Sequence, residues 1–240
     1  MGDIAESGLE LVVARYREDI AWTRNVLKGV RVSVYDKGGG HGLPDGIEAI
    51  PLANVGREAH TYLWHLTRRY DSLAPVTVFC QGHPFDHAHD LHRVLRAIAS
   101  GVKCVQEFLW LGFIIDTDDR RGRRLFVPWG GNPGGRELPL DEVHEALLGE
   151  PCPERVRFYP GGQFAVTAGC ARSRPREFFE RALEMAAADD LRAHCFERLW
   201  DRVFGVRGVD DAVMGGRDTV YLKPIRRLMR EGMPCRGSVF

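Results

Sequence analysis

The chain has 240 residues, of which 44% are hydrophobic and 28% are charged, and this composition excludes a generally disordered protein. Its 33 Lys and Arg residues balance 33 Asp and Glu residues, so no net charge is present to attract nucleic acid or an anionic lipid surface. A chain of this length can bury one sizeable hydrophobic core. We therefore expect a single domain, and nucleic acid is a poor candidate for its partner.

The N-terminal sequence and the cysteines indicate where the protein resides. Residues 1–8 lack the basic and apolar segments of a secretory signal, and no apolar run approaches the ~20 residues that span a bilayer. The six cysteines are dispersed without a Cys-x-x-Cys pair, so neither a zinc knuckle nor a disulfide framework is predicted. We expect a reduced, cytoplasmic protein without an integral membrane segment.

Strand and helix patterns alternate in the N-terminal part of the chain. Residues 9–14 are almost all apolar and predict a strand, residues 20–27 predict a helix, and residues 30–35 alternate with the period of two that is typical of a strand. Residues 57–70 then place apolar and aromatic side chains at helical spacing. Asn54 precedes this helix and is a candidate for its N-cap.

The segment 76–80, Val-Thr-Val-Phe-Cys, predicts a strand that is buried on both faces. It is followed by polar side chains and then by a helix over residues 90–100 that Gly101 ends. Ligands in open α/β sheets collect outside the carboxyl ends of the strands. The polar residues after this strand are therefore the first candidate site.

The rest of the chain continues the same alternation. Patterns predict a strand within residues 108–115 that pairs with 125–127, an extended segment over 156–167, and helices over 139–148, 175–188, 191–204 and 223–230. We predict one α/β domain over residues 9–205, in which helices flank a mixed, mostly parallel sheet. Residues 1–8 form a tail, and residues 206–240 form an extension packed on the same domain.

A cluster of metal-competent side chains follows the central strand. His83, Asp86, His87 and His89 offer imidazole and carboxylate groups, which suit Mn, Fe, Ni and Zn. If the chain is helical from Asp86 onward, Asp86 and His89 share a face whereas His87 points elsewhere. The alternative is that Asp86 caps a helix and the histidines are surface residues.

Two further groups of residues are candidates for binding an anion. Asn54, Gly56, Arg57 and Glu58 lie at a loop-to-helix junction, where free backbone N–H groups and a guanidinium can hold phosphate or carboxylate. Arg15 and Lys37 each end a predicted strand and could bind the same anion. The alternatives are helix capping with a surface ion pair, and ordinary solvated strand ends.

Three later motifs each allow two interpretations. Asp116-Thr-Asp118-Asp119 is a literal Asp-x-Asp that suits Mg or Mn, although the arginines after it favour a solvated hairpin tip. Gly161 and Gly162 indicate either close approach of a ligand to the backbone or a bulge. Glu197 lies on an aromatic-rich helix, where it is either a general base or the partner of an arginine.

Six short motifs occur in order and carry a family resemblance. They resemble an uncharacterised domain-of-unknown-function family and are more remotely similar to GT-A-fold glycosyltransferases of rhamnan and capsular-polysaccharide synthesis. The similarity spans roughly residues 9–205. The motifs are Val12–Asp19, Val34–Gly38, Asn54–Leu63, Gln81–His87, Gly161–Val166 and Phe196–Trp200.

The resemblance implies a nucleotide-sugar site at the ends of the first strands, a divalent metal bound after a central strand, and a Glu on a later helix. Glu197 matches that Glu, and Asp86 is a second catalytic candidate. No Asp-x-Asp follows the central strand, so a Mn or Mg ion would rely on Asp86 with His83, His87 and His89. The implied ligand-binding residues are Arg15, Tyr16, Lys37, Asn54, Gly56, Arg57, Glu58, Gln81, Gly161, Gly162 and Gln163.

We therefore expect a glycosyltransferase-like enzyme of GT-A-like fold that binds a nucleotide-activated sugar or a similar anionic ligand. One alternative is a metal-dependent hydrolytic or redox enzyme that holds Fe or Zn in the His and Asp cluster of residues 83–92. The other alternative is a ligand-binding module without catalysis.

Overall fold

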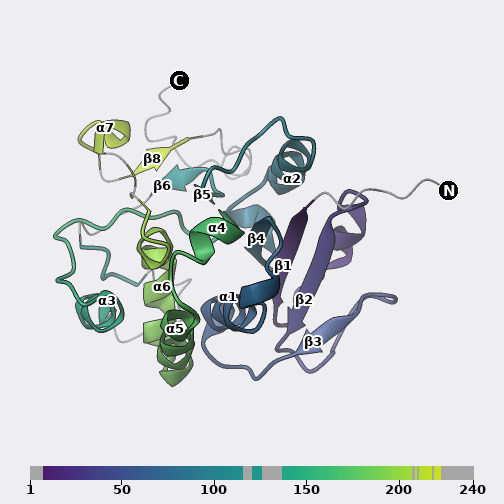
Figure 1. The fold of residues 1–240 in the computed structure, drawn as a ribbon, viewed down its shortest axis with the longest axis horizontal. Helices are drawn as coiled ribbons and strands as arrows, with labels where there is room; N and C mark the ends of the chain where they lie inside the picture. Colours follow the sequence, from purple (N-terminus) through teal and green to yellow (C-terminus); the bar gives the residue numbers. More distant parts are fainter. Residues whose placement is uncertain are drawn as a thin grey trace, which may run out of the picture.

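The computed structural model describes residues 8–115, 121–125, 137–206, 209, 211–217 and 219–222. A six-stranded sheet with the order β3-β2-β1-β4-β7-β5 forms its centre (Figure 1). Strands β3, β2, β1 and β4 are parallel, and β7 runs antiparallel between β4 and β5. The predicted mixed, mostly parallel α/β architecture is confirmed. The strands are β1 Leu9–Arg15, β2 Arg31–Asp36, β3 Ala49–Pro51, β4 Val76–Gln81, β5 Phe108–Trp110 and β7 Phe164–Thr167.

The register of the parallel strands brings their carboxyl ends to one edge of the sheet. Arg15, the last residue of β1, lies opposite Asp36, and its neighbour Ala14 lies opposite Gln81 of β4. Every residue of β1 is buried, because strands flank it on both sides and helices or loops cover both faces. Side chains from three strands can therefore meet just beyond this edge.

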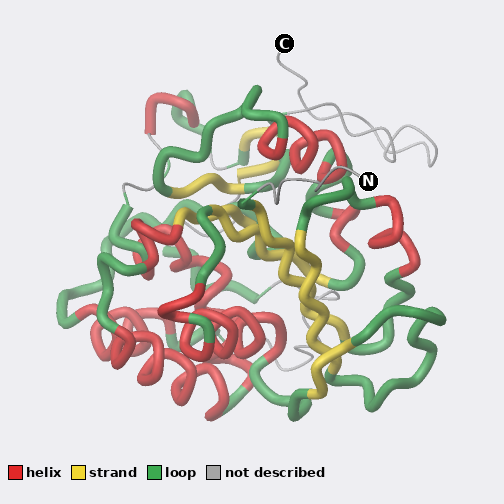
Figure 2. The backbone as a smooth tube through the Cα atoms, turned by 45° about the vertical axis from the view of Figure 1, so that its right-hand side comes forward, coloured by secondary structure: helices red, strands yellow, loops and turns green. Residues whose placement is uncertain are grey.

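Three helices cover one face of the sheet, namely α1 Arg57–Arg68, α5 Arg176–Ala188 and α6 Asp190–Val203. Figure 2 shows the strands running through the middle of the molecule beside these helices. The rings of Phe79 and Phe164, on neighbouring strands, lie 5.0 Å apart. Tyr62 of α1 packs on both rings, and Trp200 of α6 packs on Phe164 and on Tyr62. This aromatic cluster joins the helices to the sheet.

Shorter elements cover the other face. The 3-10 helix η1 Ala21–Asn25 and the helix α2 Leu91–Ala99 enclose a second apolar cluster with the inner residues of β1 and β4. Helix α3 Leu140–Leu148 packs on the outer side of α6. The remaining elements are η2 Tyr70–Ser72, η3 Pro84–Asp86, β6 Ile114–Ile115, α4 Ala168–Ala171, α7 Asp211–Met214 and β8 Val220–Tyr221, of which β6 and β8 form a separate two-stranded sheet.

Most of the predicted elements are confirmed, and the differences have local causes. The helix expected over 20–27 is the short η1, and the residues expected to be extended over 156–167 form a strand only in β7. Gly161 and Gly162 have φ values of 91° and 56°, which end the extended conformation. Residues 108–115 hold strands of two different sheets, and the segments 126–127 and 223–230 lie outside the described residues.

A polar network is buried where β1 and β2 begin. Glu10 is fully buried and accepts hydrogen bonds from Arg31 and from Ser33 Oγ at 2.6 Å. His65 Nε2 lies 3.8 Å from the Glu10 carboxylate, and His65 Nδ1 is hydrogen-bonded to Tyr35 Oη at 2.8 Å. Burial lowers the pKa of His65 to about 4. Burial opposes ionisation of Glu10, but the hydrogen bonds from Arg31 and Ser33 and the charge of Arg31 prevail and hold its pKa below the usual value.

The network predicts that the fold loses stability in mild acid. Between pH 6.5 and about 4, His65 stays neutral in the folded chain but binds a proton in the unfolded chain, so protonation favours unfolding by up to about 1.4 kcal/mol per pH unit. Below pH 4.5 Glu10 binds a proton more readily in the unfolded chain than in the folded chain, and this difference adds to the effect. Denaturant titrations at several pH values should show the free energy of unfolding falling from pH 7 to pH 4.

The variant His65→Gln should be less stable at pH 7 and should show a shallower pH dependence. His83→Gln is the matched control, because that side chain is 53% exposed and should leave the wild-type slope unchanged. Parallel slopes for wild type and His65→Gln would contradict the prediction.

Candidate functional site

Charged residues from β1 and β2 meet at the carboxyl edge of the sheet. Arg15 is buried and forms an ion pair with Asp36, and its Nε and Nη2 donate to the carbonyls of Glu18 at 2.9 Å and His41 at 2.6 Å. Asp36 in turn accepts from the backbone N–H of Gly40 at 2.6 Å. Arg15 was expected to bind a ligand, but its guanidinium is occupied by these groups and shapes the loops after β1 and β2.

The adjacent turn begins helix α1 in an unusual conformation. Gly56 and Arg57 have φ values of 60° and 49°, and Arg57 is the only non-glycine residue with positive φ in the described part of the chain. Lys37 Nζ donates to the carbonyls of Val55, at 2.6 Å, and of Arg57. Asn54 was expected to cap this helix or to lie close to its start; the N-cap is Gly56, two residues further on, and no side chain caps the helix.

Two largely buried carboxylates, Glu58 on α1 and Glu197 on α6, interact electrostatically. Glu58 and Glu197 have 12% and 17% of their side chains exposed. Glu197 accepts a hydrogen bond from Gly161 N–H at 2.6 Å and forms an ion pair with Arg198. Burial opposes its ionisation, but Arg198 and the Gly161 N–H prevail and keep its pKa below the usual value. Glu58 has a raised pKa, because burial and the charge of Glu197 outweigh Arg57.

His194 and Tyr62 interact electrostatically with these carboxylates. His194 lies one turn before Glu197 on α6 and is 8% exposed, and burial lowers its pKa to about 4. Tyr62 lies one turn after Glu58 on α1, and its fully buried hydroxyl has no hydrogen-bond partner. Burial and then the charges of Cys80, Glu58 and Glu197 raise the pKa of Tyr62 well above 10. The pair therefore has a neutral imidazole and an unused hydroxyl nearby.

The Gly161-Gly162 loop closes one side of the carboxylate pair. A Cβ on Gly161 would lie 2.5 Å from Cγ of His87, so the imidazole packs directly on the glycine backbone. A Cβ on Gly162 would lie 3.3 Å from Trp200 Nε1. These glycines allow the backbone N–H of Gly161 to reach the carboxylate of Glu197.

The remaining predicted ligand residues are spread along the edge. Tyr16 is 41% exposed with the Arg17 guanidinium over its ring, and Gln81 is partly buried at the end of β4. Gln163 is fully buried, and its Nε2 donates to the Pro84 carbonyl at 3.0 Å. Its Oε1 has no partner. None of these contacts joins the three side chains to Glu58 or Glu197.

The four expected metal ligands are not brought together. His83 and Asp86 lie 3.8 Å apart and are about half exposed, His87 faces Gly161, and the His89 ring packs on Phe113 at 5.4 Å. Within the residues that the structure describes, no group of three His, Cys, Asp or Glu side chains is arranged to hold a metal ion. The Asp116-x-Asp118 motif lies outside those residues. The donors present thus do not fit a metal centre built by these side chains.

Sequence reasoning missed Tyr62 and His194 as members of the site. Tyr62 follows Glu58 by four residues, and His194 precedes Glu197 by three, so helical spacing alone places each beside its glutamate. Their burial and the missing partner of the Tyr62 hydroxyl are tertiary features that no local pattern indicates.

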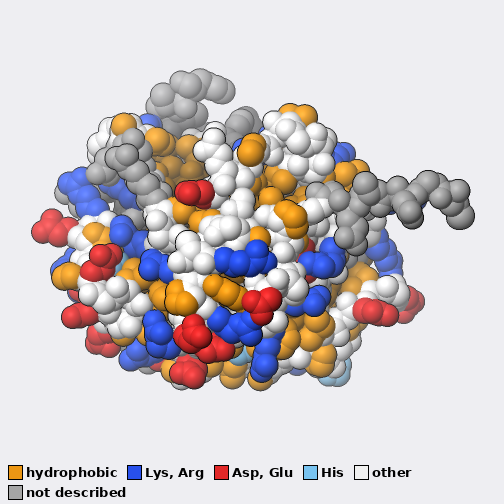
Figure 3. Space-filling view, in the orientation of Figure 1, with side chains coloured by type: hydrophobic (Ala, Val, Ile, Leu, Met, Phe, Trp, Pro, Cys, Tyr) orange, Lys and Arg blue, Asp and Glu red, His pale blue; other side chains and the backbone are white. Residues whose placement is uncertain are grey.

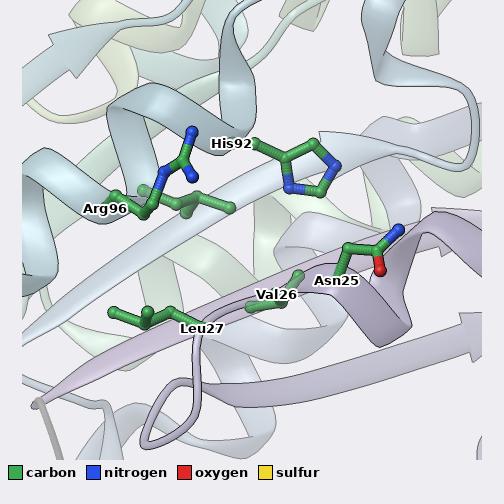
Figure 4. A pocket seen from close by; sticks show the side chains of 6 residues that line it. Asn25, Val26, Leu27, His92 and Arg96 are labelled. Atoms are coloured by element: carbon green, nitrogen blue, oxygen red, sulfur yellow. The ribbon is translucent and has the colours of Figure 1, made fainter.

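A hollow lined by residues of η1, α2 and the loop after η1 lies away from this site. It has a volume of about 330 Å³ and lies between η1 and α2 on the opposite face of the sheet. Figure 4 shows His92 and Arg96 on one side and Asn25, Val26 and Leu27 on the other. The face of the molecule in Figure 3 carries basic and acidic side chains intermingled.

Comparison with known proteins places part of the chain in context. The mixed sheet flanked by helices makes this an α/β protein. Residues 11–107 match the model of a family described as protein of unknown function (DUF3431). The match agrees with the resemblance to an uncharacterised family. No curated protein and no solved structure matches the chain, so the more remote similarity to glycosyltransferases has no support from these comparisons.

None of the helices in the described residues is long and apolar enough to cross a membrane.

Gly161→Ala should test the packing of the glycine loop. The new methyl group would meet His87 and would also strain a backbone with φ of 91°. Gly149→Ala is the matched control, since its φ is 75° and nothing lies within 4 Å of the added atom. Denaturant unfolding should show a loss of about 1 kcal/mol for Gly149→Ala, and roughly 1–3 kcal/mol more for Gly161→Ala. Equal losses would argue against close packing of His87 on the loop.

Proposed function

We propose that the protein is an enzyme that binds a nucleotide-activated sugar at the carboxyl edge of the sheet and transfers the sugar to an acceptor hydroxyl. The observation that carries this proposal is the pair Glu58 and Glu197, whose pKa values are shifted in opposite directions. Two neighbouring carboxyl groups with divergent pKa values allow one to act as a base while the other stays protonated. Such a pair is suited to moving a proton from a hydroxyl group.

The anionic part of the donor is assigned to the start of α1. Arg57 is 40% exposed, and its contact with Glu58 is long at 3.9 Å, so its guanidinium is accessible to a phosphate. The N-terminus of α1 adds the partial positive charge of the helix dipole. The unpartnered Tyr62 hydroxyl supports a ligand nearby, because buried polar groups normally have partners.

In the proposed reaction, the oxygen of the acceptor hydroxyl bonds to the anomeric carbon of the sugar, and Glu197 accepts the proton that this hydroxyl loses. The bond from that carbon to the phosphate oxygen breaks, and the nucleoside diphosphate leaves with the electron pair. Glu197 remains ionised in the resting protein because Arg198 and Gly161 stabilise its charge. Glu58, whose ionisation is opposed by burial and by the charge of Glu197, orients the acceptor through a hydrogen bond.

The fold and the motifs support this class of ligand by analogy. A mixed, mostly parallel sheet flanked by helices agrees with the GT-A-like fold that the motifs suggest. No step is assigned to a metal ion, because the described side chains do not form a metal site. A divalent cation such as Mn or Mg would then be carried by the diphosphate of the donor.

A panel of nucleoside diphosphates and their sugar conjugates should identify a ligand that raises the melting temperature, with and without Mn. At 100 times the dissociation constant such a ligand adds about 2.7 kcal/mol to the free energy of unfolding. Arg57→Ala should weaken binding, whereas Arg93→Ala, which removes an arginine 74% exposed on α2, should not. Flat melting temperatures across the panel would overturn the proposal.

Glu197→Gln should separate catalysis from folding once the donor is known. We expect turnover in single-turnover assays to fall by about 10²–10⁴-fold, while the affinity for the donor is retained. The stability loss should stay near 1–2 kcal/mol, because Arg198 also donates to the carbonyls of Gly122, His194 and Arg124. Glu184→Gln, on the exposed side of α5, is the control. A fully active Glu197→Gln would remove the base from the mechanism.

A further inference from the structure

Lys37 has an unusual environment for a lysine. It follows β2 directly, is only 8% exposed, and its backbone N–H donates to the Arg15 carbonyl at 2.9 Å. Its ammonium donates to the carbonyls of Val55 and Arg57. Among the described residues no carboxylate forms an ion pair with it, so two backbone carbonyls replace most of its hydration. Burying a charge in this way is costly unless the contacts it makes are needed.

The two carbonyls that Lys37 binds belong to the strained turn at the start of α1. Arg57 adopts the left-handed region that side chains other than glycine rarely occupy, at a cost of roughly 1–3 kcal/mol. Gly56 is left-handed as well, and a Cβ there would lie 2.4 Å from the Ala186 carbonyl of α5. The turn is therefore held from one side by α5 and from the other side by the Lys37 ammonium.

The turn sets the position of the proposed reacting groups. Arg57 and Glu58 are the first two residues of α1, and Glu58 interacts with Glu197 of α6. If the Val55 and Arg57 carbonyls lose their common donor, Arg57 can relax to negative φ. That change would rotate the peptide that joins Arg57 to Glu58 and would move both side chains.

We propose that Lys37 is a positioning residue, whose ammonium fixes the left-handed turn and so holds Arg57 and Glu58 in place for the reaction. Lys37 was expected to bind the ligand anion directly. Its bonds to two carbonyls point instead to an indirect role. The inference rests on the proposed function for its effect on ligand binding, but the turn itself can be tested without any ligand.

The charges around Lys37 make the turn sensitive to alkaline pH. Burial lowers the pKa of Lys37 to about 8, Glu58 and Asp190 oppose this shift, and Arg57 adds to it. His60 also faces the ammonium but is neutral at this pH, since its own pKa is about 4. As the pH rises through about 8, the Lys37 ammonium loses a proton and its positive charge. The hydrogen bonds that it donates to the Val55 and Arg57 carbonyls then become weaker.

Hydrogen exchange of the 53–60 amides, measured with matched inorganic pyrophosphate titrations, tests this role. In Lys37→Met these amides should exchange on the order of tenfold faster than in wild type, and pyrophosphate should bind more weakly. Lys37→Arg should restore both, because a guanidinium stays charged and can donate to both carbonyls. Lys103→Met, which removes an exposed lysine, is the control and should match wild type.

The pH dependence of hydrogen exchange is a second test, and it does not require Lys37→Met to fold. After correction for intrinsic exchange, wild type should show a rise in 53–60 exchange near pH 8, and Lys37→Arg should not. Unchanged exchange in Lys37→Met, or the same alkaline rise in Lys37→Arg, would overturn the role of Lys37. If the exchange results hold but neither pyrophosphate nor any nucleotide binds wild type, the turn role stands and the proposed function fails.

Discussion

The structure depends on the parallel pairing of β1 with a strand on each side. Both faces of β1 are covered, so its seven residues are all buried and its backbone is hydrogen-bonded to β2 and β4. Parallel strands end at the same edge, and the loops that leave them must turn there. The Arg15 and Asp36 ion pair is therefore a consequence of strand direction, and so is the placement of Lys37 beside the start of α1.

The carboxylate pair arises from a different constraint, the packing of α1 and α6 on one face of the sheet. The aromatic cluster of Tyr62, Phe164 and Trp200 fixes how far apart these helices lie. Glu58 and Glu197 sit one turn or less from members of that cluster, so the apolar core determines the environment of the charged groups. Core packing and pKa shifts are thus parts of one arrangement.

Periodicity was sufficient to predict the long elements but not the short ones. Strands β1 and β4 and helices α2, α5 and α6 have continuous apolar patterns, whereas Ala49–Pro51 is too short to carry a pattern and was missed as β3. Arg57 and Glu197 were chosen from motifs. Local sequence does not encode how these two residues are placed relative to each other. Nor does it encode the left-handed φ of Arg57 or the carbonyl partners of Lys37, because all three depend on contacts between segments far apart in the chain.

The buried Glu10 has a consequence for how the strands align. Its donors Arg31 and Ser33 lie on β2, with Arg31 directly opposite Glu10. Sliding β2 by one residue would turn Arg31 and Ser33 to the other face and leave a carboxylate without donors in the apolar interior. A purely hydrophobic pairing of Val and Leu residues would tolerate such a slip far better. Glu10, near the start of β1, therefore selects a single register of β2 against β1.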